Sequence, residues 1–325
     1  MTPFPDTGII AQPRLPDFDV RITPPDIAPW VAGNIGLPGF ASFKATEAGP
    51  HVAVLALTHG NEIAGAVVLD ALLRQGIRPL RGTLTLGFCN LAAFARFDRA
   101  RPTASRFVDE DLNRVWDLDV LDGPRESYEL ERARAMRPLF DTVDVLLDLH
   151  SMLWPSDPLI LSGATSKGRA LAAQIEAPDL VVADKGHVSG RRIIDYLRFE
   201  DLGTQACGNL VEAGQHWLPS TIEMTERVVL SLLRSHGMVS GVPGPVSEKR
   251  KCAEVTHVIT AATSSFAFVQ LFRGGDVVAR RNTLIALDGT TEIRTPYDNC
   301  LLVMPSLRPS RGHTAVRLAR FFRAR

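Results

Sequence analysis

Two short segments of the sequence bring together the residue types that bind a catalytic metal ion. The first is His59-Gly-Asn-Glu62, which follows a run of apolar residues, and the second is Asp148-Leu-His150, which ends another such run. Two imidazoles and one carboxylate form a zinc site whose fourth position is open to water, and zinc lowers the pKa of that water towards roughly 7. Taken alone, however, either histidine is better explained as a core or capping residue, and the metal site is favoured because each histidine ends a strand with a carboxylate within reach.

A polar segment between these two carries arginine and asparagine side chains, at Arg106, Asn113 and Arg114. Guanidinium groups bind carboxylates through paired hydrogen bonds, so the segment is suited to an acidic ligand. A solvated loop, in which Asp109 or Asp111 pairs with a neighbouring arginine, explains the same residues equally well. The spacing by itself favours neither interpretation.

Glu212 is the remaining residue with a potential role in catalysis. It ends the segment Gly208-Asn-Leu-Val-Glu212, which has the pattern of a strand, and Gly214 follows in a turn. A carboxylate beside a metal-bound water can act as a general base and then as a general acid towards a leaving amine. Without a metal site, a surface glutamate at a strand end is the simpler interpretation.

The elements around these residues predict an α/β fold. Residues 51–57 and 143–149 form short continuous apolar runs, which are typical of strands buried on both faces. Further strands are expected at 81–88, 158–161, 180–183 and 209–211, and helices at 62–73, 90–97, 126–140 and 219–236, with a polar loop at 98–123. Ligands of open α/β sheets bind outside the carboxyl ends of the strands, so both metal-binding segments should reach one edge of the sheet.

Glycine and proline residues between 237 and 245 divide the chain into two predicted domains. Residues 1–240 form the larger one, with an extended lead-in at 1–45, and residues 245–325 form a small all-β domain. Strands are expected there at 257–260, 265–271, 277–278, 283–287 and 301–304. Four arginines near the C-terminus are expected in a solvated tail: Arg317, Arg320, Arg323 and Arg325.

Composition narrows the class of protein. The chain has 325 residues, of which 36 are Lys or Arg and 36 are Asp or Glu, and this neutral balance argues against a nucleic-acid-binding surface. No apolar run approaches the roughly 20 residues that span a bilayer, and the N-terminus lacks the pattern of a signal peptide. The four cysteines are scattered, which favours a reducing compartment. We therefore expect a cytoplasmic protein that binds neither nucleic acid nor membranes.

The segments, taken together and in this order, resemble the succinylglutamate desuccinylase/aspartoacylase family, which is related to the zinc carboxypeptidases. The family pattern is H-G-x-E, R-x-x-D-x-D-L-N-R, D-L-H and E-x-G, and clear matches cover roughly residues 50–215. The resemblance implies a zinc-carboxypeptidase-like mixed β-sheet flanked by helices, with a small all-β C-terminal domain.

The resemblance also assigns roles to individual residues. It implies that one zinc ion per chain is held by three of them: His59, Glu62 and His150. Glu212 would be the general base, and Arg106 would polarise the scissile carbonyl and stabilise the oxyanion. Asn113 and Arg114 would bind the carboxylate of the substrate.

Two carboxylates have expected supporting roles. Asp111 is expected to brace its loop, and Asp148 either orients a zinc-bound histidine or is merely a carboxylate at a strand end. Family members often carry a further arginine and a tyrosine before the glutamate motif, and here we expect Tyr196 and Arg198 to contact the substrate. Other candidates for these contacts are Arg191, Arg192 and, from the C-terminal domain, Tyr297.

The activity implied is zinc-dependent hydrolysis of the linear amide bond of an N-acyl amino acid. The expected partner is a small N-acylated amino acid with a carboxylate, and a homo-oligomer is possible. A metallocarboxypeptidase that acts on small peptides would use the same ligands. A non-catalytic binding module is the alternative from another class, and loss of a ligand or of the glutamate would have favoured it. No G-x-S-x-G motif follows a strand, which disfavours a serine hydrolase.

Overall fold

The computed structural model describes residues 18–187 and 189–322. Their contacts form two compact units, one made mainly of Asp19–Val255 and the other mainly of Thr256–Arg320. The predicted division into a catalytic domain up to residue 240 and a β domain from residue 245 stays a prediction.

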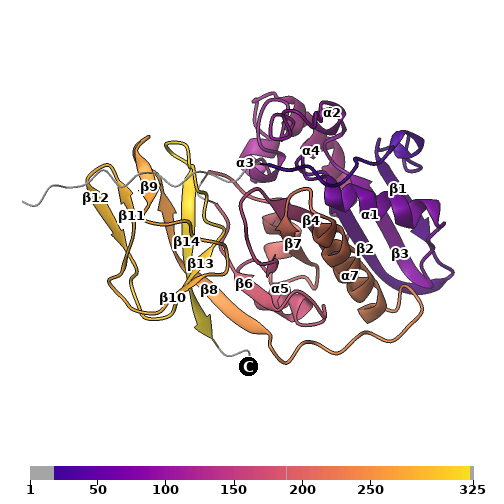
Figure 1. Cartoon of the computed structure of the whole chain (residues 1–325). Coiled ribbons are helices and arrows are strands. Elements are labelled where there is room, and N and C mark those ends of the chain that lie inside the picture. Colours follow the sequence, from indigo (N-terminus) through magenta and orange to yellow (C-terminus); the bar gives the residue numbers. More distant parts are fainter. Residues whose placement is uncertain (1–17, 188, 323–325) are drawn as a thin grey trace, which may run out of the picture. The chain divides into compact units, whose positions relative to one another are not determined.

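The larger unit is built on a mixed β-sheet (Figure 1) with the strand order β1-β3-β2-β4-β7-β5-β6, and the first residues of β8 pair with β6. Its strands are β1 (Phe40–Lys44), β2 (Glu47–Ala56), β3 (Arg81–Phe88), β4 (Val145–Met152), β5 (Leu159–Leu161), β6 (Leu180–Ala183), β7 (Cys207–Gln215) and β8 (Lys251–Thr260). Strands β3, β2, β4 and β7 are parallel to one another, whereas the edge strand β1 and the short β5 run antiparallel to their neighbours β3 and β7. The mixed sheet confirms the predicted fold class.

The central strands are apolar because both faces of the sheet are covered. Every residue of β4 is buried, as are the last five residues of both β2 and β3. Helices α1 (Ile63–Arg74) and α7 (Pro219–Ser235) pack against each other and against these strands. Gly65 allows α1 to approach closely, since a Cβ there would lie 3.0 Å from Leu149 Cβ.

The direction of Leu149 fixes which residues face away from α1. Side chains alternate along a strand, so Asp148 and His150 point to the face opposite Leu149. Glu212 of β7 is in register with His150 of the parallel strand β4 and therefore points to the same face. The sheet thus presents the carboxylate and the imidazole side by side, near the carboxyl ends of their strands.

The segments outside the sheet contain more helix than the sequence pattern indicates. The predicted loop at 98–123 includes the short helices η2 (Leu112–Arg114) and α3 (Leu118–Leu121), and α5 (Ser166–Ala172) is an element that the pattern missed. Each begins at a side chain that caps its first turn: Asp111, Asp117 and Thr165. The remaining helices are η1 (Ala28–Trp30), α2 (Leu91–Ala95), α4 (Tyr128–Phe140), η3 (Ile193–Asp195) and α6 (Leu197–Glu200).

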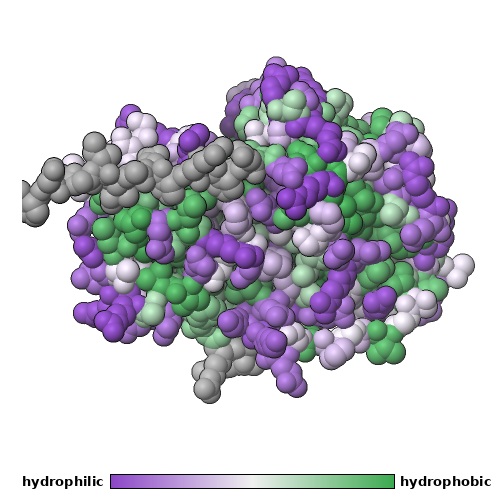
Figure 2. All heavy atoms as spheres, viewed as in Figure 1, coloured by the Kyte–Doolittle hydropathy of each residue, from purple (hydrophilic) through white to green (hydrophobic). Residues whose placement is uncertain are grey.

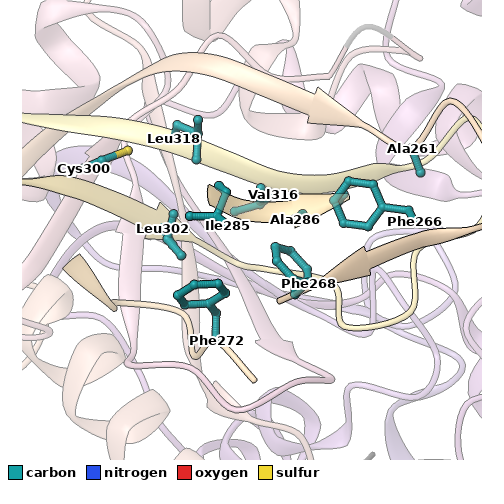
Figure 3. Packing of buried hydrophobic residues seen from close by; sticks show 11 residues of the cluster. Ala261, Phe266, Phe268, Phe272, Ile285, Ala286, Cys300, Leu302, Val316 and Leu318 are labelled. Carbon is teal, nitrogen blue, oxygen red and sulfur yellow. The ribbon is translucent and has the colours of Figure 1, made fainter. Parts of the chain in front are cut away.

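The smaller unit consists of strands, as predicted. Its sheets have the orders β8-β14-β13-β10 and β12-β11-β9. Their strands are β9 (Phe266–Phe268), β10 (Val277–Val278), β11 (Leu284–Asp288), β12 (Thr291–Arg294), β13 (Cys300–Val303) and β14 (Thr314–Phe322). Buried aromatic and aliphatic side chains pack between them (Figure 3), with the rings of Phe266 and Phe268 5.2 Å apart. This cluster is the core of the unit.

The prediction of a solvated C-terminal tail is wrong for Arg317, whereas Arg320 is exposed but lies in a strand and not in a tail. Arg317 is buried and lies within β14, and the guanidinium of Arg320 lies 4.4 Å from the centre of the Tyr297 ring. The apolar residues at 315, 316, 318 and 319 are buried in this strand. The free energy gained by burying them outweighs the cost of placing charged arginines in the same strand. Arg323 and Arg325 lie outside the described residues.

The visible surface differs between the parts of the chain (Figure 2). Hydrophobic residues gather over strands of the smaller unit, at the left of the view. Among the described helices, none combines the length and apolar character that a membrane span requires.

Candidate metal site

His59, Glu62 and His150 converge at the edge of the sheet. One potential ligand atom from each lies within 4.8 Å of the others, and all three residues are buried. The Glu62 carboxylate lies between the two imidazoles, with Oε1 2.8 Å from His59 Nδ1 and Oε2 3.0 Å from His150 Nδ1. This is the one such group of His, Cys, Asp and Glu residues within 18–187 and 189–322.

His59 and Glu62 lie in the tight turn that follows β2. Leu57 has a φ of 59°, a region that bulky residues avoid, and its carbonyl accepts a hydrogen bond from the Asn90 N–H. Gly60 is required because a Cβ there would lie 2.4 Å from the carbonyl carbon of Ala93. The neighbouring segments thus impose a strained turn on the residues that present the metal-binding groups.

Each imidazole contacts a second carboxylate through Nε2, the ring nitrogen that does not face Glu62. His59 Nε2 lies 2.9 Å from Asp111 Oδ1, and His150 Nε2 lies 2.7 Å from Asp148 Oδ2. The Thr58 hydroxyl donates to the other oxygen of Asp148 at 2.8 Å. A carboxylate at this position can hold the proton of a histidine on Nε2, which leaves Nδ1 to bind a metal, although Arg106 Nη2 also lies 2.9 Å from His59 Nε2.

The charges of the site favour a cation. Burial raises the pKa of Glu62, but the adjacent His59 and His150 outweigh burial and hold it well below its usual value. Burial likewise lowers the pKa of His150, yet the carboxylates of Asp148 and Glu62 raise it well above the ordinary value. The lowered pKa keeps the Glu62 carboxylate ionised, and a divalent metal can supply the compensating positive charge in place of protons.

Arg106 lies directly beside the three residues. Its Nη1 donates to Glu62 Oε1 at 3.2 Å and its Nη2 to Asp111 Oδ2 at 3.1 Å. The Gly60 N–H donates to the Arg106 carbonyl at 3.0 Å, which ties the arginine to the turn that carries His59. A guanidinium at this position can reach both the metal site and a ligand beside it.

Asn113 and Arg114 occupy η2, next to the same site. Asn113 Nδ2 lies 3.4 Å from His150 Nε2, while its Oδ1 accepts the Ile193 N–H at 2.8 Å. Arg114 Nη1 donates to the Asn113 carbonyl, and Nη2 lies 2.8 Å from His187 Nε2. The structure therefore brings six of the nine predicted site residues into one constellation, to which Glu212 adds a seventh through its register with His150.

Comparison with known proteins identifies the family. The model of the succinylglutamate desuccinylase/aspartoacylase catalytic domain matches residues 48–235, which is more than half of the chain. The chain belongs to the succinylglutamate desuccinylase/aspartoacylase family. The family predicted from the four motifs is thereby confirmed.

Individual relatives match a shorter part. Aspartoacylase of Mus musculus is 33% identical over 34% of this chain and 36% of its own length. N-acyl-aromatic-L-amino acid amidohydrolase (carboxylate-forming) A of Danio rerio is 30% identical over 31% of this chain and 32% of its own length. The matched segment thus spans about a third of the length of these curated relatives.

Solved structures of the family share the fold. Succinylglutamate desuccinylase from Vibrio cholerae has a TM-score of 0.67 at 17% identity, over 87% of this chain and 85% of that chain. Murine aminoacylase 3 has a TM-score of 0.60 at 16% identity, over 86% of this chain and 97% of that chain. The arrangement of the strands is therefore that of the family, even where the sequences have diverged.

Within this family fold, Tyr196 and Arg198 bond to residues away from the candidate metal site, and their expected contact with the substrate stays a prediction. The Tyr196 hydroxyl donates to Asp141 Oδ1 at 2.7 Å, and Arg198 Nη2 donates to Asp144 Oδ1 at 3.1 Å. Both acceptors precede β4, whereas His150 lies near the carboxyl end of that strand. At about 3.3 Å per residue, roughly 20 Å of strand separates the two positions.

The other candidates from this segment are also engaged elsewhere. Arg192 is buried, and its guanidinium donates to Asp195 Oδ2 at 2.6 Å and to Asp184 Oδ2 at 3.2 Å. Arg191 forms ion pairs with Asp117 and Glu200. In the smaller unit, the Tyr297 hydroxyl lies 2.6 Å from Thr256 Oγ1.

Two further histidines, His187 and His216, contact residues at or next to the candidate site. His187 lies against Arg114, and His216 Nδ1 lies 2.7 Å from the hydroxyl of Ser151, the residue after His150. Burial lowers the pKa of His216 to about 4, so its imidazole is neutral at neutral pH. No spacing rule links either histidine to its partner, because the contacts depend on the folded loops.

Proposed function

We propose that this chain is a zinc-dependent amidohydrolase that cleaves the amide bond of an N-acyl amino acid. The observation that carries the proposal is the convergence of His59, Glu62 and His150, with each imidazole held by a carboxylate. One oxygen and two nitrogen ligands suit zinc, whereas calcium and magnesium prefer oxygen ligands alone. The names of the family and of its relatives support the same class of substrate.

The proposed reaction adds water to the acyl carbon and breaks the bond between carbon and nitrogen. Zinc would act as a Lewis acid and lower the pKa of the attacking water. Glu212 takes a proton from that water and passes it to the amine nitrogen as the bond breaks. The products are a free carboxylate and a free amine, so no further reactant is needed.

The remaining residues bind and orient the substrate. Arg106 donates a hydrogen bond to the carbonyl oxygen, where negative charge develops in the transition state. Arg114 and Asn113 bind the carboxylate of the amino acid. Asp148 and Asp111 keep the two imidazoles in the tautomer that binds the metal.

The proposed activity is tested with a panel of N-acetyl, N-succinyl and N-aroyl amino acids, assayed for release of the free amine. We expect turnover of at least one of these, complete loss after chelation, and recovery on addition of zinc. Activity that survives chelation would contradict the proposal. Release of C-terminal residues from longer peptides, without action on the panel, would favour a metallocarboxypeptidase instead.

Asp148→Asn is expected to weaken zinc binding about 10- to 100-fold, because the amide no longer accepts the proton of His150 Nε2 as a carboxylate does. Zinc affinity measured by competition with a chromophoric chelator checks this. Asp119→Asn, at an exposed carboxylate on α3, is the matched control. Unchanged affinity in Asp148→Asn would mean that this carboxylate does not orient the histidine.

A further inference from the structure

Glu129 is a buried carboxylate outside the proposed catalytic residues. It lies in the first turn of α4 and is completely shielded from solvent. Its Oε1 accepts hydrogen bonds from the Val108 N–H at 2.6 Å and from Asn90 Nδ2 at 2.9 Å. Its Oε2 accepts the N–H groups of Asp109 at 3.0 Å and Glu110 at 3.2 Å. Four donors thus offset the cost of burying the charge.

These bonds converge on one short segment. Three consecutive backbone N–H groups, at 108–110, point at the same carboxylate, which fixes the path of the chain there. The segment lies between Arg106, whose guanidinium contacts Glu62, and Asp111, which contacts His59. The conformation of residues 108–110 therefore helps to determine the backbone position of Arg106, and so the point from which its side chain extends.

The backbone is anchored both at Arg106 and in the residues that follow it. The Gly60 N–H binds the Arg106 carbonyl, and Glu129 binds the residues that follow. Asn113 has an independent anchor, because its Oδ1 accepts the Ile193 N–H. Loss of Glu129 should therefore disturb Arg106 more than the residues that bind the substrate carboxylate.

We infer that Glu129 is a positioning residue, which holds residues 106–111 so that Arg106 is presented to the scissile carbonyl. The kinetic part of this inference rests on the proposed function. The structural part, that one carboxylate orders the segment, does not depend on it. A purely stabilising role for Glu129 would predict a less stable protein with an unaltered turnover per folded molecule.

The test is Glu129→Gln, which keeps the size of the side chain but places an NH₂ group against N–H donors. We expect zinc content to be unchanged, KM to change little and kcat to fall about 10- to 100-fold. In an Arg106→Ala background the same change should lower kcat no further, since Glu129 acts through Arg106. Glu131→Gln, an exposed residue of the same helix, is the matched control.

Hydrogen exchange provides a readout without catalysis. The amides of residues 108–110 should exchange faster in Glu129→Gln than in the wild type or Glu131→Gln. If the wild type hydrolyses no substrate, this result still decides the structural part, and the proposed function fails alone. Unchanged exchange, or a lower melting temperature with normal kcat per bound zinc, would overturn the inference. If Glu129→Gln does not fold, Glu129→Asp replaces it, because the shorter side chain reaches the N–H groups less well. The same two measurements, kcat per bound zinc and exchange of the amides of residues 108–110, then apply.

Discussion

Glu212→Gln is expected to keep its zinc and to lose about three orders of magnitude in kcat. The amide has the shape of the carboxylate but cannot accept the proton of the attacking water, and general acid–base catalysis contributes about 10²- to 10⁴-fold. Glu212 is buried on β7 in register with His150, so the two side chains point to the same face of the sheet. Kinetics at saturating substrate, combined with zinc analysis of the same sample, measure the effect.

Two outcomes would contradict this assignment. Near-normal turnover in Glu212→Gln would show that another group is the base. Loss of zinc in the same variant would show instead that Glu212 helps to hold the metal. Glu226→Gln, at an exposed position of α7, should leave both zinc content and turnover unchanged.

His59→Ala and His150→Ala are expected to reduce kcat/KM by a thousandfold or more, through loss of the metal. Zinc supplies several kcal/mol of transition-state stabilisation, and each 1.36 kcal/mol corresponds to about tenfold in rate. Circular dichroism should show a folded protein, because each truncation leaves the surrounding strands intact. Activity close to that of the wild type in either variant would contradict the proposed ligand set.

The convergence of His59, Glu62 and His150 could be predicted from the sequence because it depends on local structure. His59 and Glu62 lie in a turn that directly follows a buried strand, and His150 lies near the end of another, so strand direction alone brings them to one edge. The family motifs then indicated which of several polar residues belong together. The order of motifs was a stronger guide than any one of them.

For Tyr196 and Arg198 the sequence carries no comparable information about position. Tyr196 and Arg198 precede Glu212 closely in the sequence, but their partners Asp141 and Asp144 lie before the start of β4. Residues that are close in sequence to a strand residue can lie at either end of that strand, because a loop can return to either edge of the sheet. The strand at Thr314–Phe322 was missed because its arginines outweighed its apolar residues in the pattern, whereas burial of the apolar face decided the structure.

Residues that act through other residues leave even less signal. Glu129 looks like an ordinary acidic residue at the start of a helix, a common and unremarked position. Its four hydrogen bonds come from two separate segments, around Asn90 and 108–110, which meet only in the folded chain. Hydrogen bonds between segments that are distant in the sequence become visible only in a structure.

The most direct test of the account is the zinc content of the purified protein, measured by elemental analysis alongside three variants. We expect about one zinc ion per chain in the wild type and in His313→Ala, which alters an exposed histidine of the smaller unit, and almost none in His59→Ala and His150→Ala. A wild type that contains no zinc and takes up none when it is added would contradict the account. Full zinc content in either ligand variant would do the same.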